Sequence, residues 1–414
     1  MSSDKKKSLL KIIGPGMLIA ATGVGAGDLA TAAFTGNKLG VAILWAVLLG
    51  AFFKYVLNEG LTRWQLVTGE TILEGAMKRF GKPVQIGFMI YFLVWSFLVA
   101  AALMSACGAV THALFPIFQD ANTAKIVFGV VHSLLGLILV KVGGYGLFEA
   151  LMGIMTGMMF FTVVISAILL KPDLAQIAVG LVYPTLPHFT DGGVGWTIAL
   201  MGGVGGTVTI LCYGYWIREE ERLSIEDLPV CRIDLAVGYV MTAIFGLAMV
   251  VIGSQIDVPE GSGSGLVIKL AGKLESEIGA FGKWGFLIGA WSTVFTSLFG
   301  VWQSVPYLFS DQWNLLTAKG AELKKVDIRS KSYRYYLYAI TFVPMFGLWV
   351  GFSKMQKLYA MVGACFMPML AITLLILNTP SKWMGERYKN RPATIVILSF
   401  ILIFFIAAGF YSQD

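Results

Sequence analysis

A single aspartate in a glycine-rich stretch is the residue with the clearest chemical potential in this sequence. Residues 22–31 read Thr-Gly-Val-Gly-Ala-Gly-Asp-Leu-Ala-Thr, so Asp28 follows three glycines inside a long apolar run. Glycines at this density disfavour a helix, and a carboxylate inside an apolar span is costly and usually functional. An aspartate after a break can also cap the helix that follows, and capping is compatible with ligand binding. We interpret Asp28 as facing a substrate or an ion.

A second glycine-rich stretch interrupts a later apolar run. Residues 201–209 read Met-Gly-Gly-Val-Gly-Gly-Thr-Val-Thr. Two interrupted helices at matching positions of inverted repeats indicate the binding site of a secondary transporter, because unwound backbone offers carbonyls and amides at mid-membrane depth. The glycines could instead serve only close helix packing, but packing alone would not require Asp28. The candidate substrate-binding residues are therefore Thr22, Gly25, Ala26, Asp28, Gly203, Gly206, Thr207 and Thr209, with Asp28 as the metal ligand.

The elements that must position these residues are membrane-spanning helices. The 414 residues are 57% hydrophobic and only 13% charged, which excludes an ordinary soluble protein. The apolar runs are continuous and about 20 residues long, as a helix needs to cross a bilayer, and they lack the alternation of barrel strands. The predicted spans are about 9–36, 39–60, 84–112, 126–143, 146–170, 194–216, 235–253, 284–306, 335–352, 357–377 and 393–411.

The basic residues predict how these spans are oriented. Most of the 31 lysines and arginines fall on the side that holds the N-terminus, which makes that side cytoplasmic and places the C-terminus outside. We expect one integral membrane domain over residues 1–414, located in the plasma (inner) membrane, with a monomer favoured. The net charge of +7 is explained by loops that face anionic lipid, so no nucleic-acid partner is expected. The scattered cysteines and histidines predict neither a cofactor nor an enzyme.

Other polar residues within or next to the spans have weaker signals. Lys54 and Glu59 lie five residues apart in the second span, and we expect a structural role in which they reach toward the membrane surface. The charged run 218–222 is expected to be a solvated, salt-bridged loop or a cytoplasmic gate, and the solvated loop is favoured. Gln303 and Ser304 could line a pathway or form a helix–helix hydrogen bond.

The sequence resembles the natural resistance-associated macrophage protein (Nramp) family of divalent-metal transporters. The resemblance rests on Gly14-Pro15-Gly16 opening the first span, the break at 25–28, Leu44-Trp45, Arg63 with Val67-Thr68-Gly69, and the eleven-span layout. It implies an all-α LeuT-like fold with a 5+5 inverted repeat, broken helices 1 and 6, and an eleventh helix. The first repeat would cover about 9–170, the second 194–377, and helix 11 would cover 393–411.

The metal-ligand positions depart from the family pattern. Residues 25–28 stand where the family has Asp-Pro-Gly-Asn, and 209–211 stand where it has Met-Pro-His. The glutamine of its tenth helix falls near 366–367 here, and the third helix has no acid between residues 92 and 110. Without the thioether, one carboxylate with carbonyls and hydroxyls suits a hard ion better than a soft metal. Magnesium, which keeps several waters, fits such a site.

Two functions follow from this pattern. The leading hypothesis is a transporter of a divalent metal cation that works by alternating access, with Asp28 as its main charged ligand and with proton coupling doubtful. The alternative keeps the fold and makes the substrate a small organic amine or amino acid, whose amine would pair with Asp28.

Overall fold

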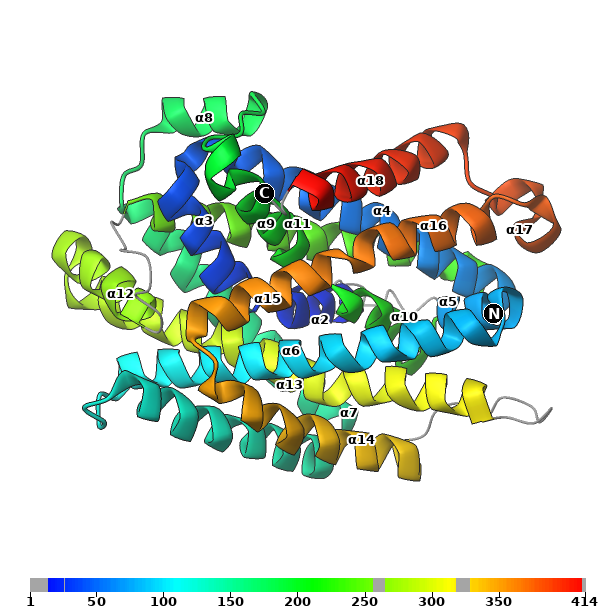
Figure 1. The fold of residues 1–414 in the computed structure, drawn as a ribbon, viewed down its shortest axis with the longest axis horizontal. Helices are drawn as coiled ribbons and strands as arrows, with labels where there is room; N and C mark the ends of the chain where they lie inside the picture. The colour runs from blue at the N-terminus through cyan, green and yellow to red at the C-terminus, as the bar shows by residue number, and fades with distance from the viewer. Residues whose placement is uncertain (1–13, 26, 256–264, 318–327, 412–414) are drawn as a thin grey trace, which may run out of the picture.

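The chain folds almost wholly into helices (Figure 1). The computed structural model describes residues 14–25, 27–255, 265–317 and 328–411. Within these ranges, eight helices are long and apolar enough to cross a membrane. The predicted all-α polytopic architecture is therefore confirmed.

The first half of the chain begins with a broken helix. Its parts are α2 (Gly14–Gly23), the short turn η1 (Gly27–Thr31) and α3 (Ala32–Leu39). The segments that follow are η2 (Gly40–Ile43), α4 (Leu44–Thr68), α5 (Ile72–Phe80), α6 (Lys82–Leu114), α7 (Ala121–Leu169) and α8 (Leu174–Val182). The predicted spans 126–143 and 146–170 are joined in α7, which kinks at Gly144 because its φ of 58° is a glycine conformation.

The second half contains another broken helix at the corresponding place. After η3 (Phe189–Gly193), it comprises α9 (Val194–Gly203), η4 (Val208–Cys212) and α10 (Tyr213–Glu219). The remaining segments are η5 (Ile225–Asp227), α11 (Leu228–Ser254), α12 (Gly265–Ile278), α13 (Ala280–Thr317), α14 (Lys331–Phe342), η6 (Val343–Trp349), α15 (Phe352–Ala364), α16 (Phe366–Asn378), α17 (Ser381–Tyr388) and α18 (Pro392–Tyr411). Within the described residues, the eleven predicted spans fall mostly on helical segments, interrupted at the two breaks and at short joins between neighbouring segments.

Local capping explains several helix starts. Thr71 and Glu74 form a reciprocal capping box at the start of α5, which satisfies backbone amides that have no partner within the helix. The Asp120 carboxylate caps α7 by accepting from the amides of Asn122 and Thr123. These two N-terminal caps fix the residues at which α5 and α7 begin.

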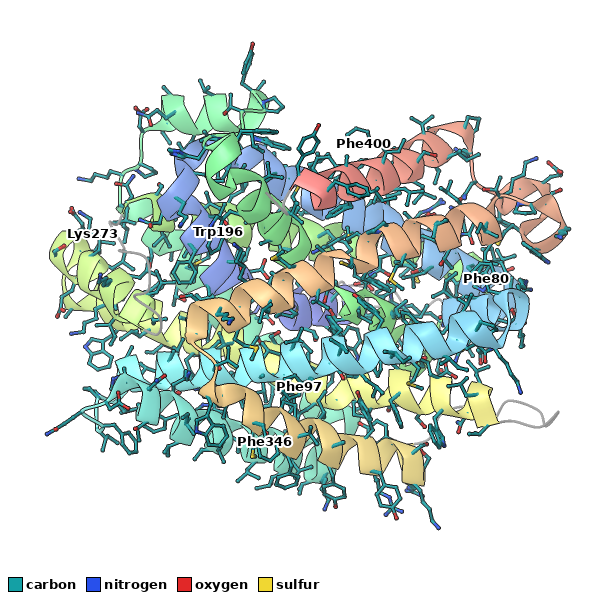
Figure 2. The ribbon with its side chains drawn as sticks, viewed as in Figure 1. Phe80, Phe97, Trp196, Lys273, Phe346 and Phe400 are labelled. Carbon is teal, nitrogen blue, oxygen red and sulfur yellow. The ribbon has the colours of Figure 1, made fainter. Side chains whose placement is uncertain are left out.

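The first helix is buried in the molecule, and the outer surface of the molecule is largely apolar. The α2 helix lies inside the molecule and packs against α7, α11 and α13 (Figure 1). Large apolar side chains point outward from the peripheral segments, as Phe346 and Phe400 do in Figure 2. A surface of this kind is stable in contact with lipid chains, so the structure fits the predicted bilayer.

Two glycines let α11 cross α3 at close range. A Cβ atom added at Gly36 would collide with the Val250 carbonyl oxygen. One added at Gly253 would collide with the Ala33 carbonyl oxygen. Because both obstacles are backbone atoms, only glycine fits without moving a helix.

Gly253→Ala should therefore destabilise the protein, by about 1–3 kcal/mol, since overpacking forces the two helices apart. The measurement is the apparent melting temperature of the purified protein in detergent. Gly157→Ala is the matched control, because a Cβ there has no other atom within 4 Å and alanine favours the helix. Equal losses for the two variants would contradict the close-crossing explanation.

Candidate functional site

Asp28 lies where the two broken helices meet. Its side chain is fully buried in the turn η1. One carboxylate oxygen, Oδ2, accepts a hydrogen bond from the Gly25 amide at 3.2 Å. The other, Oδ1, accepts from the Gly205 amide at 3.3 Å. A single carboxylate thus bridges both breaks, which is more than capping its own helix would require.

Glycine conformations keep this junction open and close-packed. Gly205 and Gly206 have φ angles of 76° and 83°, which side chains other than glycine rarely adopt. A Cβ atom at Gly23 would lie 2.7 Å from the carbonyl carbon of Gly205. The two unwound segments are therefore in direct backbone contact beside Asp28.

Lys54 of α4 completes the junction, and the sequence analysis did not place it there. Its side chain is fully buried. The Nζ atom donates to the carbonyl oxygen of Gly202 at 2.9 Å and also to that of Val204. These carbonyls belong to the C-terminal end of α9, where the helix dipole favours a cation. The expectation that Lys54 reaches toward the membrane surface is wrong.

The charge of Lys54 also acts on Asp28. The two side chains attract each other electrostatically within the same buried region. Because the protein interior has a lower dielectric constant than water, this attraction is weakly screened. The junction therefore pairs one acidic side chain with one basic side chain, so the pair has no net charge. A lysine well inside an apolar span was the signal that could have identified it, since such residues are rarely incidental.

Four of the other predicted residues also lie at the junction, and one cannot be placed. Gly25 contacts Asp28 directly, while Gly203 lies between the two residues whose carbonyls hold Lys54. Gly206 packs against Gly23, and Thr209 lies beside Gly206. Ala26 lies outside the described residues.

Two predicted threonines are braced by neighbouring helices. Thr207 accepts a hydrogen bond from the Trp95 indole nitrogen at 2.7 Å, and its side chain does not cap η4. The Thr22 carbonyl accepts from the Ser297 hydroxyl at 2.7 Å. The buried Thr22 hydroxyl has no hydrogen-bond partner among the described residues. Helices α6 and α13 thus hold the two breaks in place.

The charged run after α10 is less solvated than expected. Arg222 is buried and forms an ion pair with Asp234 of α11 at 2.9 Å. The Asp234 carboxylate also accepts from the Gly16 amide at 2.7 Å. The prediction of a solvated loop is therefore wrong for Arg222, which instead helps to connect α10, α11 and the start of α2.

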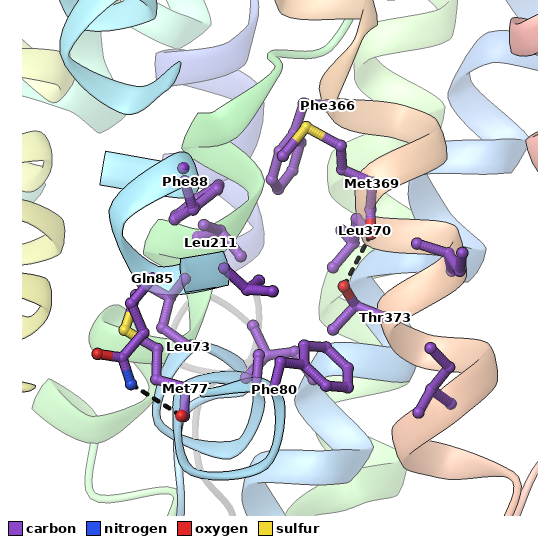
Figure 3. Close-up of a pocket in the computed structure, with 16 residues that line it drawn as sticks. Leu73, Met77, Phe80, Gln85, Phe88, Leu211, Phe366, Met369, Leu370 and Thr373 are labelled. Atoms are coloured by element: carbon purple, nitrogen blue, oxygen red, sulfur yellow. Dashed lines mark hydrogen bonds between the residues drawn. The ribbon is translucent and has the colours of Figure 1, made fainter. Parts of the chain in front are cut away.

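Two cavities lie outside the Asp28 junction, and the wall of the first is too apolar for an ion site. A cavity of about 660 Å³ lies between α5, the start of α6, η4 and α16, and its wall is mostly apolar (Figure 3). In Figure 3, Gln85 points its amide at the Met77 carbonyl, which accepts at 2.8 Å. A second cavity of about 690 Å³ is lined by Gln303, whose Oε1 accepts from Trp216. The helix–helix hydrogen bond considered for Gln303 is therefore present, and the same side chain lines this cavity.

The atoms at the junction that could coordinate a cation are oxygen atoms. In the described part of the chain, no group of three or more histidine, cysteine, aspartate or glutamate side chains could hold a metal. Asp28 and the backbone carbonyls of the second break remain as oxygen ligands, which suit hard cations.

Comparison with known proteins identifies the family of this chain. Residues 16–413 match the family described as natural resistance-associated macrophage protein-like. An uncharacterized protein of Pasteurella multocida is 26% identical over 263 residues, covering 63% of this chain and 58% of its own length. The divalent metal cation transporter MntH of Bacillus subtilis is 24% identical, covering 60% and 59% respectively. The matched region thus spans less than two thirds of these relatives.

Solved structures share the fold. A manganese transporter of Eremococcus coleocola has a TM-score of 0.73 at 14% identity and covers 100% of this chain and 88% of its own. MhsT in complex with L-phenylalanine has a TM-score of 0.66 at 15% identity and covers 98% and 99%. The predicted LeuT-like fold with broken helices 1 and 6 is confirmed by these neighbours. With the family match extending over nearly all its residues, the chain belongs to the natural resistance-associated macrophage protein family.

Proposed function

We propose that the protein transports a divalent metal cation across the membrane by alternating access, with Asp28 as the main charged ligand. The observation that carries this proposal is the fully buried Asp28 carboxylate, which bridges the two broken helices through the amides of Gly25 and Gly205. Movement of one break relative to the other would change the ligand set, as alternating access requires. The Bacillus subtilis relative and the Eremococcus coleocola structure are named as metal transporters, which supports the same substrate class.

Lys54 holds the carbonyls that a cation would use. Its ammonium donates to the carbonyls of Gly202 and Val204 and faces Asp28, as a bound cation would. A divalent ion entering beside this group would be repelled by it. We infer that ion binding displaces the ammonium from these carbonyls. The Lys54 ammonium would then occupy these carbonyls when no ion is bound, and the ion would occupy them when it is bound.

The donor set favours a hard or hydrated ion, such as magnesium, over soft transition metals. Asp28 offers carboxylate oxygens, Gly202 and Val204 offer carbonyls, and the unpartnered Thr22 hydroxyl offers a further oxygen nearby in sequence. Soft metals are selected by thiolate or thioether ligands, which the family motif supplies and this chain lacks at 209–211. The absence of acids on the third helix argues against the family's proton route.

The remaining predictions complete this proposal. Residues about 9–170 and 194–377 would form the inverted repeats that rock against each other, with helix 11 at 393–411 outside them. The N-terminus would be cytoplasmic and the C-terminus outside, in the plasma membrane. The transporting unit would be a monomer.

One observation favours a second substrate class. Asp28 and Lys54 form a pair of opposite charges, and a zwitterion carries the complementary pair. An amino acid could place its amine at Asp28 and its carboxylate at Lys54. MhsT, which shares the fold, was solved with L-phenylalanine. The substrate would then exploit the ammonium that a metal ion must displace.

Uptake into proteoliposomes discriminates these substrates. We expect the purified protein to accumulate Mg²⁺, with Mn²⁺ and Ca²⁺ as competitors, and to show no preference for Cd²⁺, because cadmium seeks soft ligands. A mixture of amino acids should neither inhibit this uptake nor be taken up. Amino-acid uptake without ion uptake would establish the second candidate, and uptake of neither class would refute the transport proposal.

A further inference from the structure

A strongly basic groove lies away from the junction, at the opposite end of α4 from its first residues. It has a volume of about 760 Å³ and is formed by α4, η5, the start of α11 and the segment joining α17 to α18. Its basic side chains come from several of these elements and are Arg63, Arg232, Arg387, Lys389 and Arg391. Glu59 and Glu226 are the carboxylates among its lining residues, and Lys389 is paired with Glu386 at 2.6 Å, so positive charge is still in excess.

Some arginines of this groove are paired with a carboxylate of the described residues, and others are not. Glu59 binds Arg232 at 2.7 Å and also lies 3.3 Å from Arg63, so one carboxylate serves two arginines. Arg387 and Arg391 are exposed, and neither has a carboxylate partner within the part of the chain that the structure describes. Arg387 lies over the ring of Tyr388 at 5.4 Å. These two guanidinium groups are therefore available to an external anion.

The segment that carries the available arginines is held in place. Arg63 donates through Nη1 to the Tyr388 carbonyl at 2.5 Å and through Nη2 to the Asn390 side chain at 2.9 Å. The Asn390 backbone amide donates to the Asn378 carbonyl at 2.8 Å. This anchoring fixes the backbone from which the two arginines project. A ligand would meet a preorganised site, which lowers the entropic cost of binding.

The groove also has an apolar wall on its membrane side. Val56, Leu228 and Ile397 line it together with the basic residues. Helix α18 starts at Pro392, next to Arg391 of the groove, and exposes Val396 and Phe400. Charged groups thus gather at the helix ends, where headgroups lie, while apolar side chains continue into the depth of the bilayer.

We propose that this groove binds the headgroup of an anionic phospholipid. Arginine forms paired hydrogen bonds with phosphate oxygens, and basic pockets between membrane helices at the cytoplasmic side bind anionic headgroups. The apolar wall would accept the first part of the acyl chains, which a soluble phosphate lacks. The bound lipid would join α4, α11 and α18 at the membrane surface.

Lipid titration of the full-length protein in detergent tests this proposal. Phosphatidylglycerol and phosphatidylcholine with identical acyl chains are added, and bound lipid is measured by native mass spectrometry alongside the melting temperature. We expect phosphatidylglycerol to half-saturate the protein at a concentration about tenfold lower or more, and to raise the melting temperature. Equal behaviour of the two lipids would overturn the proposal.

Charge-matched variants locate the site. Arg387→Gln with Arg391→Gln should raise the half-saturating concentration of phosphatidylglycerol about tenfold or more, since each basic residue contributes. Lys331→Gln with Arg334→Gln removes two exposed charges from α14 and should leave it unchanged. Equal losses in both double variants would overturn the groove assignment, and so would no loss in the first.

Two further measurements distinguish a lipid headgroup from a free anion and guard against a variant that does not fold. Arg391→Gln alone should reduce binding in the same direction, and it replaces the double variant if that protein does not fold. Soluble glycerol phosphate should not compete with phosphatidylglycerol at equal concentration, because it cannot use the apolar wall. Competition at equal concentration would show a soluble-anion site and would overturn the lipid assignment.

Discussion

Asp28→Asn should reduce divalent-cation uptake by roughly a hundredfold, or about 2.7 kcal/mol, because it removes the carboxylate charge that the proposed site offers to the ion. Asparagine has nearly the same size and can still accept a hydrogen bond from the Gly205 or Gly25 amide. The loss of uptake would therefore result from the missing charge and not from a disrupted junction. The measurement is the initial rate of uptake into proteoliposomes over a range of ion concentrations.

A buried aspartate elsewhere provides the control for this substitution. Asp311 of α13 is also buried, and its carboxylate accepts from the hydroxyls of Tyr215 and Thr71. Asp311→Asn should keep uptake within a few-fold of the wild type, because it removes the same charge outside the junction. If Asp28→Asn transports normally, or if both variants lose uptake equally, Asp28 is not the specific ligand.

Lys54→Met should produce the largest loss of stability in the absence of divalent cations. Removing the ammonium leaves the buried Asp28 carboxylate without its counter-charge and leaves the carbonyls of Gly202 and Val204 without their donor. Breaking a buried charge pair from one side costs about 3–5 kcal/mol. Adding Mg²⁺ or Mn²⁺ should restore the melting temperature of this variant far more than it raises that of the wild type, since the ion takes the vacated place.

A double-mutant cycle separates this explanation from simple loss of packing. Asp28→Asn combined with Lys54→Met removes both charges, so the double variant should be more stable than the sum of the single losses predicts. It should also gain no stability from divalent ions. Additive losses, or a Lys54→Met variant that ions do not rescue, would show that the ammonium and the ion do not share a place.

The sequence predicted the elements of this site better than their contacts. Clustered glycines in apolar runs are unfavourable for helices whatever surrounds them, so the break at 25–28 and the interruption within 201–209 could be identified locally. Asp28 was equally conspicuous. Its partner Gly205 lies 177 residues away in the chain, and Lys54 binds a carbonyl 148 residues away. Spacing along one helix carries no information about such pairs.

The errors at charged residues have the same physical origin. Lys54 has a long side chain that can extend toward the membrane surface or into the protein, and only the position of the α9 carbonyls decides between them. Arg222 lies in a charged run of the kind usually exposed to solvent, but it is buried because it forms an ion pair with Asp234 on α11. Tertiary partners override the local preference in each case.

The internal ammonium of Lys54 has an electrical consequence for the proposed transport cycle. With Lys54 beside Asp28, the unloaded junction has no net charge and, in that cycle, would reorient without work against the membrane potential. Once a divalent ion has entered and the lysine remains protonated, the loaded junction carries two positive charges. A potential of 100 mV would then contribute about 4.6 kcal/mol if both charges crossed the whole field. An inside-negative voltage could drive accumulation of the ion without any coupled proton.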